Sequence, residues 1–306
     1  MVLFPFPLLL CDIGGTNARF YLCKDPQTAP KLLVSFLTAE HGSWSQALNR
    51  VLRTAELKPA SIFVCAAGPV RGRSISLTNC GWVIDGPEIA REFGLSQGLL
   101  LNDFEALAFA LPFLRAEETL QIGQTMAERP SEGLRLVLGP GTGLGVAGLL
   151  TSGHRYFALP SEGGHSTLPS SNPEEQEIFS LIESTAERLT AETVLSGSGL
   201  LRLHQARCQY YELKAEFISE PAALLQHAIG DPDGAEAKTI KHFWNILADV
   251  AGNMALVMGA RQGVTIAGGI MPRLTAFLVH GGFRTKFEAR NPMADYCRAI
   301  PTRLIL

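Results

Sequence analysis

Charged residues are scarce in this chain of 306 residues, because Asp, Glu, Lys and Arg make up only 18% of it, where about 25% is usual. The formal net charge is −3 and no basic block occurs, so we expect no nucleic-acid partner. Hydrophobic residues reach 46%. The chain therefore has enough apolar surface to form a core, which excludes a disordered or charged-tail protein.

Long apolar runs are absent too. No run reaches the roughly 18 residues that span a bilayer, so we expect no membrane association. The apolar N-terminus has no basic region and no small-residue cleavage site, so a buried strand over residues 8–13 is favoured over a signal peptide. The six cysteines include no C-x-x-C pair and no zinc spacing, which predicts reduced core residues and a cytoplasmic location.

Two well-known phosphate-binding sequences do not place this chain among the proteins that carry them. The P-loop sequence G-x-x-x-x-G-K-[ST] does not occur, which argues against that class of NTPase. A G-x-G-x-x-G sequence does occur at 143–148, but in dinucleotide-binding folds this sequence opens a helix. Because residues 146–150 have the character of a strand, we do not expect a dinucleotide site.

What the chain does contain is an alternation of strand and helix signals, which predicts an α/β fold. Strands are expected at 8–13, 18–23, 61–66, 99–101, 134–138, 146–150 and 264–267. Helices are expected at 44–57, 104–114, 173–189, in a short segment from 191, and at 241–259. The length suggests about two domains.

One unit occurs twice. LLLCDIGGTNARFYL at 8–22 and LVLGPGTGLGVAGLL at 136–150 are both an apolar strand, a glycine turn with a threonine, and a second apolar strand. Two copies of such a unit suggest a duplicated α/β domain with a cleft between the halves.

Glycines, thirty in all, gather in turns at 14–15, 139–145 and 268–269. Consecutive backbone N–H groups without Cβ atoms form concavities that bind phosphate oxygens, and a tight hairpin without a ligand is the alternative. Asp12 precedes the first turn and would repel a phosphate unless a cation such as Mg²⁺ lay between them. Asp12 as a cap of the turn amides is the equally favoured alternative.

Polar residues gather at three further places. Asn102 and Asp103 follow a buried strand, where α/β sheets place ligands, although either could be a helix N-cap. Glu162 and His165 flank two glycines that let both side chains point inward, and an ordinary surface loop is the alternative. Glu192 begins a short helix and is most simply an acid favoured by the helix dipole.

Taken together, six segments resemble the bacterial ATP-dependent glucokinase family, part of the actin-like sugar-kinase and chaperone ATPase superfamily. The segments are CDIGGTNARF at 11–20, LNDFEALAFALP at 101–112, GPGTGLGVAGL at 139–149, LPSEGGH at 159–165, TAETVLSGSGL at 190–200 and IAGGIMPR at 266–273. They occur in the family's order and spacing over nearly the whole chain.

This resemblance implies two actin-like (ribonuclease H-like) α/β domains with a central cleft, a smaller one at 1–113 and a larger one at 114–306. It implies transfer of the γ-phosphoryl group of ATP to the 6-hydroxyl of D-glucose, with Mg²⁺, as an early step of glycolysis. A homodimer is typical of the family.

The resemblance also assigns residues. Asp103 is similar in position to the base that accepts the proton of the 6-hydroxyl. The implied glucose contacts are Asn102, Asp103, Glu162, His165 and Glu192. The implied nucleotide contacts are Cys11, Asp12, Ile13, Gly14, Gly15 and Thr16 in a first phosphate segment, Thr142 and Gly143 in a second, and Gly268 and Gly269 beside adenosine.

The sequence departs from the family at Cys11 and Ser161, where glycine is usual, and it stops at Leu306, so we expect the family's final helix to be missing. A kinase for another hexose or an amino sugar is the alternative function. A sugar-responsive regulator is disfavoured, because no helix-turn-helix precedes the first strand and no cysteine-rich zinc motif is found. An inactive chain is the remaining alternative.

Overall fold

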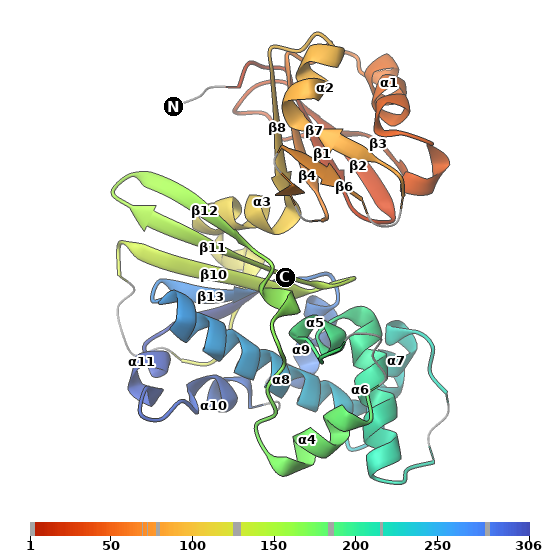
Figure 1. The fold of residues 1–306 in the computed structure, drawn as a ribbon. Helices are drawn as coiled ribbons and strands as arrows, with labels where there is room; N and C mark the ends of the chain where they lie inside the picture. The colour runs from red at the N-terminus through yellow and green to blue at the C-terminus, as the bar shows by residue number, and fades with distance from the viewer. Residues whose placement is uncertain are drawn as a thin grey trace. The chain divides into compact units, whose positions relative to one another are not determined.

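The computed structural model describes residues 4–68, 70–71, 73–77, 80–124, 130–182, 187–214, 217–278 and 282–306. The chain divides into two compact units, Met1–Ala106 and Leu107–Leu306. Each unit contains a β-sheet packed against helices (Figure 1). The α/β class expected from the alternating pattern is therefore confirmed.

The sheet of the first unit has the order β3-β2-β1-β4-β8. Its strands are β1 (Leu8–Ile13), β2 (Asn17–Cys23), β3 (Lys31–Leu37), β4 (Ser61–Ala66) and β8 (Gln97–Asn102). β1 and β2 form an antiparallel hairpin, whereas β1, β4 and β8 are parallel neighbours. The carboxyl ends of these three strands consequently lie at one edge of the sheet.

The rest of the first unit contains helices and a second, smaller sheet. It comprises the 3₁₀ turn η1 (Thr38–Glu40), α1 (Trp44–Thr54), α2 (Gly86–Glu92) and a small sheet of β5 (Val70–Arg71), β6 (Ser74–Ser76) and β7 (Val83–Asp85). The helix α1 begins where Ser43 accepts the N–H of Gln46, the usual N-cap bond. It buries Trp44, Leu48 and Val51 in the core.

The sheet of the second unit has the order β12-β11-β10-β13-β14-β9. Its strands are β9 (Thr119–Gln121), β10 (Gly133–Pro140), β11 (Leu144–Ser152), β12 (Arg155–Ser161), β13 (Gly263–Ile266) and β14 (Thr302–Ile305). β10 and β11 form a hairpin, and β10, β13 and β14 are parallel neighbours. Hairpin followed by parallel strands is the arrangement of the first unit, so both copies of the repeated unit adopt the expected structure.

Helices α3 to α11 complete the described structure. They are α3 (Asp103–Ala110), α4 (Pro173–Ser180), α5 (Ala191–Val194), α6 (Gly197–Tyr210), α7 (Pro221–Gly230), α8 (Ala235–Met258), α9 (Thr275–Leu278), α10 (Phe283–Glu288) and α11 (Ala294–Arg298). Short 3₁₀ turns are η2 (Leu111–Phe113), η3 (Ala116–Glu118), η4 (Gly163–His165) and η5 (Met271–Leu274). α8 buries Phe243, Trp244 and Leu247 in the core of the second unit.

Three expected helices are shorter than their spacing predicts, and the one expected over 44–57 ends at Thr54. The helix expected over 104–114 leaves the α-helical form at Ala110, and a 3₁₀ turn follows because Pro112 has no N–H for the helical ladder. The helix expected over 173–189 ends at Ser180, although residues 183–186 lie outside the described part. Beyond it, Leu189 accepts the N–H of Leu168, so tertiary pairing prevails over the helical pattern here.

The G-x-G-x-x-G sequence at 143–148 lies mostly within strand β11, Leu144–Ser152. The expectation that it does not open a helix is therefore confirmed. Among the helices that the structure describes, none is both long and apolar enough to cross a bilayer.

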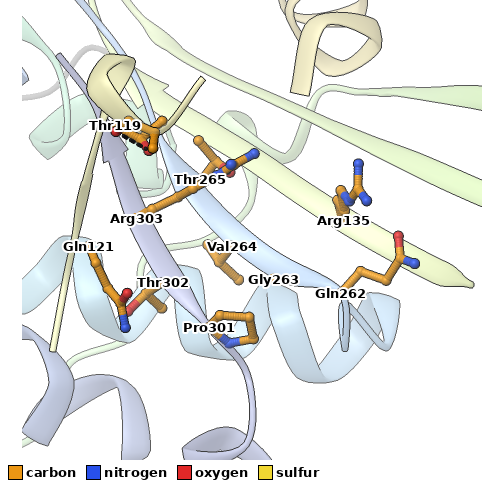
Figure 2. A pocket seen from close by; sticks show the side chains of 11 residues that line it. Thr119, Gln121, Arg135, Gln262, Gly263, Val264, Thr265, Pro301, Thr302 and Arg303 are labelled. Carbon is orange, nitrogen blue, oxygen red and sulfur yellow. Dashed lines mark hydrogen bonds between the residues drawn. The ribbon is translucent and has the colours of Figure 1, made fainter. Parts of the chain in front are cut away.

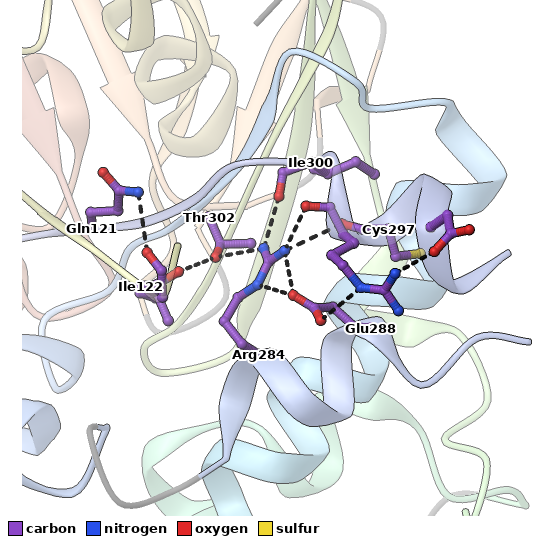
Figure 3. A network of polar contacts seen from close by, with 10 residues as sticks. Gln121, Ile122, Arg284, Glu288, Cys297, Ile300 and Thr302 are labelled. Carbon is purple, nitrogen blue, oxygen red and sulfur yellow. Dashed lines mark hydrogen bonds and ion pairs between the residues drawn. The ribbon is translucent and has the colours of Figure 1, made fainter. Parts of the chain in front are cut away.

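The last strand is tied to the helices by one arginine (Figure 3). Arg284 on α10 donates to Glu288, to the carbonyl oxygen of Ile300 at 2.8 Å and to Thr302 Oγ1 at 3.1 Å. Thr302 Oγ1 in turn donates to the carbonyl oxygen of Ile122 at 2.7 Å. Because only 12% of the Arg284 side chain is exposed, its loss would leave buried acceptors without a donor.

We expect Arg284→Ala to destabilise the protein by about 3 kcal/mol, since it leaves buried carbonyl groups without a donor and leaves Glu288 with its ion pair to Arg298 at 3.7 Å. Denaturant unfolding would measure this. Arg115→Ala is the matched control, because Arg115 forms only exposed ion pairs with Glu117 and Glu118, which contribute little. Equal unfolding midpoints for the two variants would contradict the prediction.

Candidate functional site

In the first unit, strand register brings the predicted site residues to one sheet edge. Asp12 on β1 is in register with Cys65 on β4, and Cys65 is in register with Leu101 on β8. The glycine turn that follows Asp12 and the pair Asn102–Asp103 that follows Leu101 therefore leave the sheet at the same edge, with β4 between their strands. Sequence position alone does not relate them; the parallel pairing does.

The first glycine turn is held by its neighbours through backbone bonds. The N–H of Gly14 donates to the carbonyl oxygen of Asn17 at 2.9 Å. Thr38 donates its N–H to the Thr16 carbonyl oxygen and its hydroxyl to the Gly15 carbonyl oxygen. These bonds orient the turn, and they use the N–H of Gly14 and the carbonyl groups of Gly15 and Thr16.

Cys11 and Ile13, unlike the polar residues of this segment, have buried side chains. Their side chains lie in the core, with 2% and 1% of their surface exposed. Only their backbone atoms could contact a nucleotide. The usual family glycine is thus replaced at Cys11 by a side chain that points into the sheet core.

Asp12 lies beside the turn with its side chain about half exposed. Its Oδ2 accepts a hydrogen bond from Arg19 Nη1 at 3.0 Å. This cross-strand pair between β1 and β2 holds the carboxylate next to Gly14, and it differs from the turn-amide cap considered as an alternative. An exposed carboxylate beside the predicted phosphate turn fits Mg²⁺, which keeps several waters and takes one or two carboxylates plus phosphate oxygens.

Asn102 and Asp103 both act at the beginning of α3. Asn102 Oδ1 accepts the N–H of Phe104 at 2.9 Å, and its amide donates to the Gly68 carbonyl oxygen at 3.0 Å. The N-cap role expected as an alternative is therefore present. Asp103 Oδ1 also accepts the Phe104 N–H, at 2.9 Å.

The carboxyl group of Asp103 has a perturbed proton affinity. Burial raises its pKa, the charge of Asp12 raises it further, and backbone hydrogen bonds oppose the shift only in part. A desolvated carboxylate is a stronger proton acceptor than an exposed one. A raised proton affinity is what the predicted role of Asp103 as a general base requires.

In the second unit, the predicted second phosphate turn is bonded to a carboxylate. The N–H of Gly141 donates to the Gly143 carbonyl oxygen at 2.7 Å, which closes the turn. The N–H of Leu144 donates to Glu192 Oε2 at 2.8 Å. Glu192, considered at first a simple helix-terminal acid, thus has a partner far away in the sequence.

Three of the predicted sugar contacts meet beside this turn. His165 Nδ1 lies 3.9 Å from Glu192 Oε1, and His165 Nε2 lies 4.0 Å from Glu162 Oε2. The loop approaches the turn so closely that a Cβ at Gly164 would lie 2.2 Å from the Leu144 carbonyl oxygen. The loop carrying Glu162 and His165 is thus packed on the turn and is more than an ordinary surface loop.

The third glycine turn lies at the same edge of the second sheet as the turn that follows β10. Ala267 donates its N–H to the Leu138 carbonyl oxygen at 2.9 Å, since β13 is parallel to β10. Gly268 has a φ of +103°, and a Cβ there would lie 2.1 Å from the Pro140 carbonyl oxygen. Only glycine fits this crossing, and Gly269 beside it is exposed.

Several residues of these sites did not stand out in the sequence. Arg19, Thr38 and Leu144 form the hydrogen bonds described above. Arg19 lies inside the segment 11–20 that resembles the family. Cys65 lies between Asp12 and Leu101 in register, and burial raises the pKa of its thiol to about 12. In the sequence, only the position of Cys65 near the end of an expected strand indicated that it lies close to the site.

Other features of the described residues lie apart from these sites. A cavity of about 390 Å³ is lined by residues of β9, β13 and β14, including Thr265 and Arg303, and by none of the predicted site residues (Figure 2). Within the described part of the chain, no group of three or more His, Cys, Asp or Glu side chains could hold a metal ion.

Comparisons with known proteins agree with this arrangement. The model of a family described as Glucokinase matches residues 9–306. A glucokinase of Sinorhizobium medicae is 38% identical over 304 residues, which are 99% of this chain and 89% of that protein.

Solved structures are similar as well. The glucokinase from an Antarctic psychrotroph has a TM-score of 0.84 and 30% identity, over 99% of this chain and 95% of that one. A ROK family glucokinase from Streptomyces griseus, in complex with glucose and AMPPNP, has a TM-score of 0.61 and 16% identity, over 95% and 97% of the two chains. The latter likeness concerns the fold alone.

The raised pKa of Asp103 has a consequence for stability. A group whose pKa is raised by folding lowers the free energy of unfolding at any pH where it is ionised in the unfolded chain. We expect Asp103→Asn, which keeps an oxygen for the Phe104 N–H, to raise the melting temperature near neutral pH. Below the ordinary pKa of aspartate the gain should vanish, because the wild-type carboxyl is then protonated.

Thermal melts of both proteins across that pH range would measure the effect. Glu117→Gln is the control, because it removes an exposed carboxylate of the second unit. An Asp103→Asn variant that is less stable than wild type near neutral pH would contradict the prediction.

Proposed function

The chain belongs to the glucokinase family and is an ATP-dependent hexose kinase, and on this premise we propose which of its residues transfer the γ-phosphoryl group to the 6-hydroxyl of D-glucose. The products are glucose 6-phosphate and ADP. The observation that carries the proposal is the bond from the Leu144 N–H to Glu192. It joins a turn suited to phosphate oxygens to a cluster suited to sugar hydroxyls.

Asp103 is the general base of this proposal. The 6-hydroxyl oxygen attacks the γ-phosphorus, the bond to the ADP oxygen breaks, and the hydroxyl proton passes to the Asp103 carboxylate. The raised pKa of Asp103 supports this role, because it brings the proton affinity of the base closer to the working pH. Phosphoryl transfer otherwise requires positioning and charge neutralisation.

The sugar is held by Asn102, Glu162, His165 and Glu192 together with Asp103. A hexose is a ring of hydroxyl groups, and carboxylates, amides and imidazoles bind such groups with directed hydrogen bonds. Buried polar groups that would remain unpaired discriminate against analogues lacking a hydroxyl. The Streptomyces griseus neighbour, solved with glucose and AMPPNP, supports this choice of ligands.

The nucleotide is held by the glycine turns. Within the segment Cys11–Thr16, the glycine turn that follows β1 faces the phosphates together with Thr142 and Gly143, and Gly268 and Gly269 lie beside adenosine. Asp12 would help to hold Mg²⁺, which when bound would neutralise phosphate charge.

We further propose a cytoplasmic enzyme that supplies glucose 6-phosphate to glycolysis and forms a homodimer. The six cysteines are free thiols, which suits a reducing compartment. The homodimer rests on the family resemblance alone.

Asp103→Ala should lower kcat by about a hundredfold or more, the usual contribution of a general base, while the affinity for AMPPNP stays near that of wild type. A coupled assay and calorimetry would measure the two quantities. Because burial raises the pKa of Asp103, wild-type kcat/KM should fall on acidification at a higher pH than an ordinary aspartate would give. Retention of most of the turnover by Asp103→Ala would remove it as the base.

A coupled assay over a panel of hexoses tests the substrate. We expect the highest kcat/KM with D-glucose, and a loss of about 1–3 kcal/mol of transition-state binding for each hydroxyl that is removed or inverted. The alternative function, a kinase for another hexose or an amino sugar, predicts a different optimum. A clear preference for a 2-acetamido sugar would overturn the assignment of glucose.

A further inference from the structure

Glu192 contacts two different elements through its two carboxylate oxygens. Oε2 accepts the N–H of Leu144 at 2.8 Å, and Oε1 lies 3.9 Å from Nδ1 of His165. About a third of the side chain is exposed. One oxygen therefore belongs to the turn assigned to phosphate, while the other faces the cluster assigned to sugar hydroxyls.

The helix that carries Glu192 does not need this side chain for its own stability. Thr190 caps α5, because its hydroxyl oxygen accepts the N–H of Thr193. The Thr193 hydroxyl oxygen in turn accepts the N–H of Thr190. This reciprocal arrangement satisfies the helix end locally. The carboxylate of Glu192 is thus free to serve the turn.

Gly143 makes room for the carboxylate. A Cβ at Gly143 would lie 2.2 Å from Glu192 Oε2 and 2.9 Å from its Cδ. The clash is with the end of a flexible side chain, so an alanine would displace the carboxylate rather than unfold the turn. Two positions earlier, a Cβ at Gly141 would find its nearest neighbour, the Gly143 carbonyl oxygen, only at 4.0 Å.

We propose that Glu192 is a positioning residue that couples the binding of the two substrates, an inference that rests on the function proposed above. A sugar hydroxyl that binds Oε1 fixes the carboxylate, and the fixed Oε2 holds the Leu144 N–H and with it the phosphate turn. Each substrate therefore raises the affinity for the other. Thermodynamic linkage requires the factor to be the same in both directions.

The first test places an alanine on the phosphate turn and measures binding of sugar. Gly143→Ala should weaken glucose binding about tenfold in the absence of any nucleotide, the size expected for one charged hydrogen bond. Gly141→Ala is the matched control and should leave the glucose Kd unchanged, because its Cβ does not touch Glu192. Calorimetry on the full chain gives both values, and circular dichroism melts check that the variants fold.

The second test changes Glu192 itself and measures the nucleotide. In wild type, saturating glucose should lower the Kd for AMPPNP, and AMPPNP should lower the glucose Kd by the same factor. Glu192→Ala should abolish this factor and weaken AMPPNP binding without glucose. Glu192→Gln should restore AMPPNP affinity, because its amide oxygen accepts the Leu144 N–H, yet it should still bind glucose poorly.

These outcomes separate the coupling from the proposed function. A Gly143→Ala variant with wild-type glucose affinity, or a Glu192→Ala variant that keeps the full coupling factor, would overturn the coupling while leaving the sugar and nucleotide sites intact. A wild-type chain that binds AMPPNP but no glucose would overturn the proposed function and the coupling together. Failure of Glu192→Gln to restore AMPPNP affinity would show that the turn bond does not carry the effect.

Discussion

Parallel pairing of strands is the constraint on which the sites depend. In each unit a hairpin supplies its first strand to a parallel ladder, β1 beside β4 and β8, and β10 beside β13 and β14. Parallel strands end at a common edge, so the segments that follow them meet there although they are distant in sequence. The glycine turns and the acidic residues occupy these edges in both units.

Close backbone approach then determines where glycine is required. At Gly164 and Gly268 a Cβ would lie within 2.2 Å of a backbone carbonyl oxygen, and at Gly143 within 2.2 Å of a carboxylate oxygen. Real Cβ atoms do not tolerate such distances. Part of the high glycine content is therefore required because segments of the chain pass very close to one another at the sheet edges. The same absence of side chains leaves N–H groups open to an anion.

Burial gives the polar residues their chemical character. Asp103 is desolvated at the start of α3, which raises its pKa, whereas Glu162 and His165 remain largely exposed beside the second turn. The buried network of Arg284 shows the complementary case, in which every charged contact is paired and serves to hold β14 against the helices. A buried carboxylate that is held by backbone hydrogen bonds suits a base, because its proton affinity is raised, whereas buried charges that form ion pairs suit a structural joint.

The sequence by itself determined the α/β class, the two strand–turn–strand units and the residues that follow strand ends. These features are local, since a strand, a glycine turn and a helix cap each depend on a few consecutive residues. It did not determine where the segment 173–189 stops being helical, because Leu189 pairs with Leu168 only in the folded chain. Nor did it reveal the partner of Glu192, which lies 48 positions away at Leu144. Only the tertiary structure decides such contacts, because they depend on strand pairing and close approach between segments whose sequences carry no sign of one another.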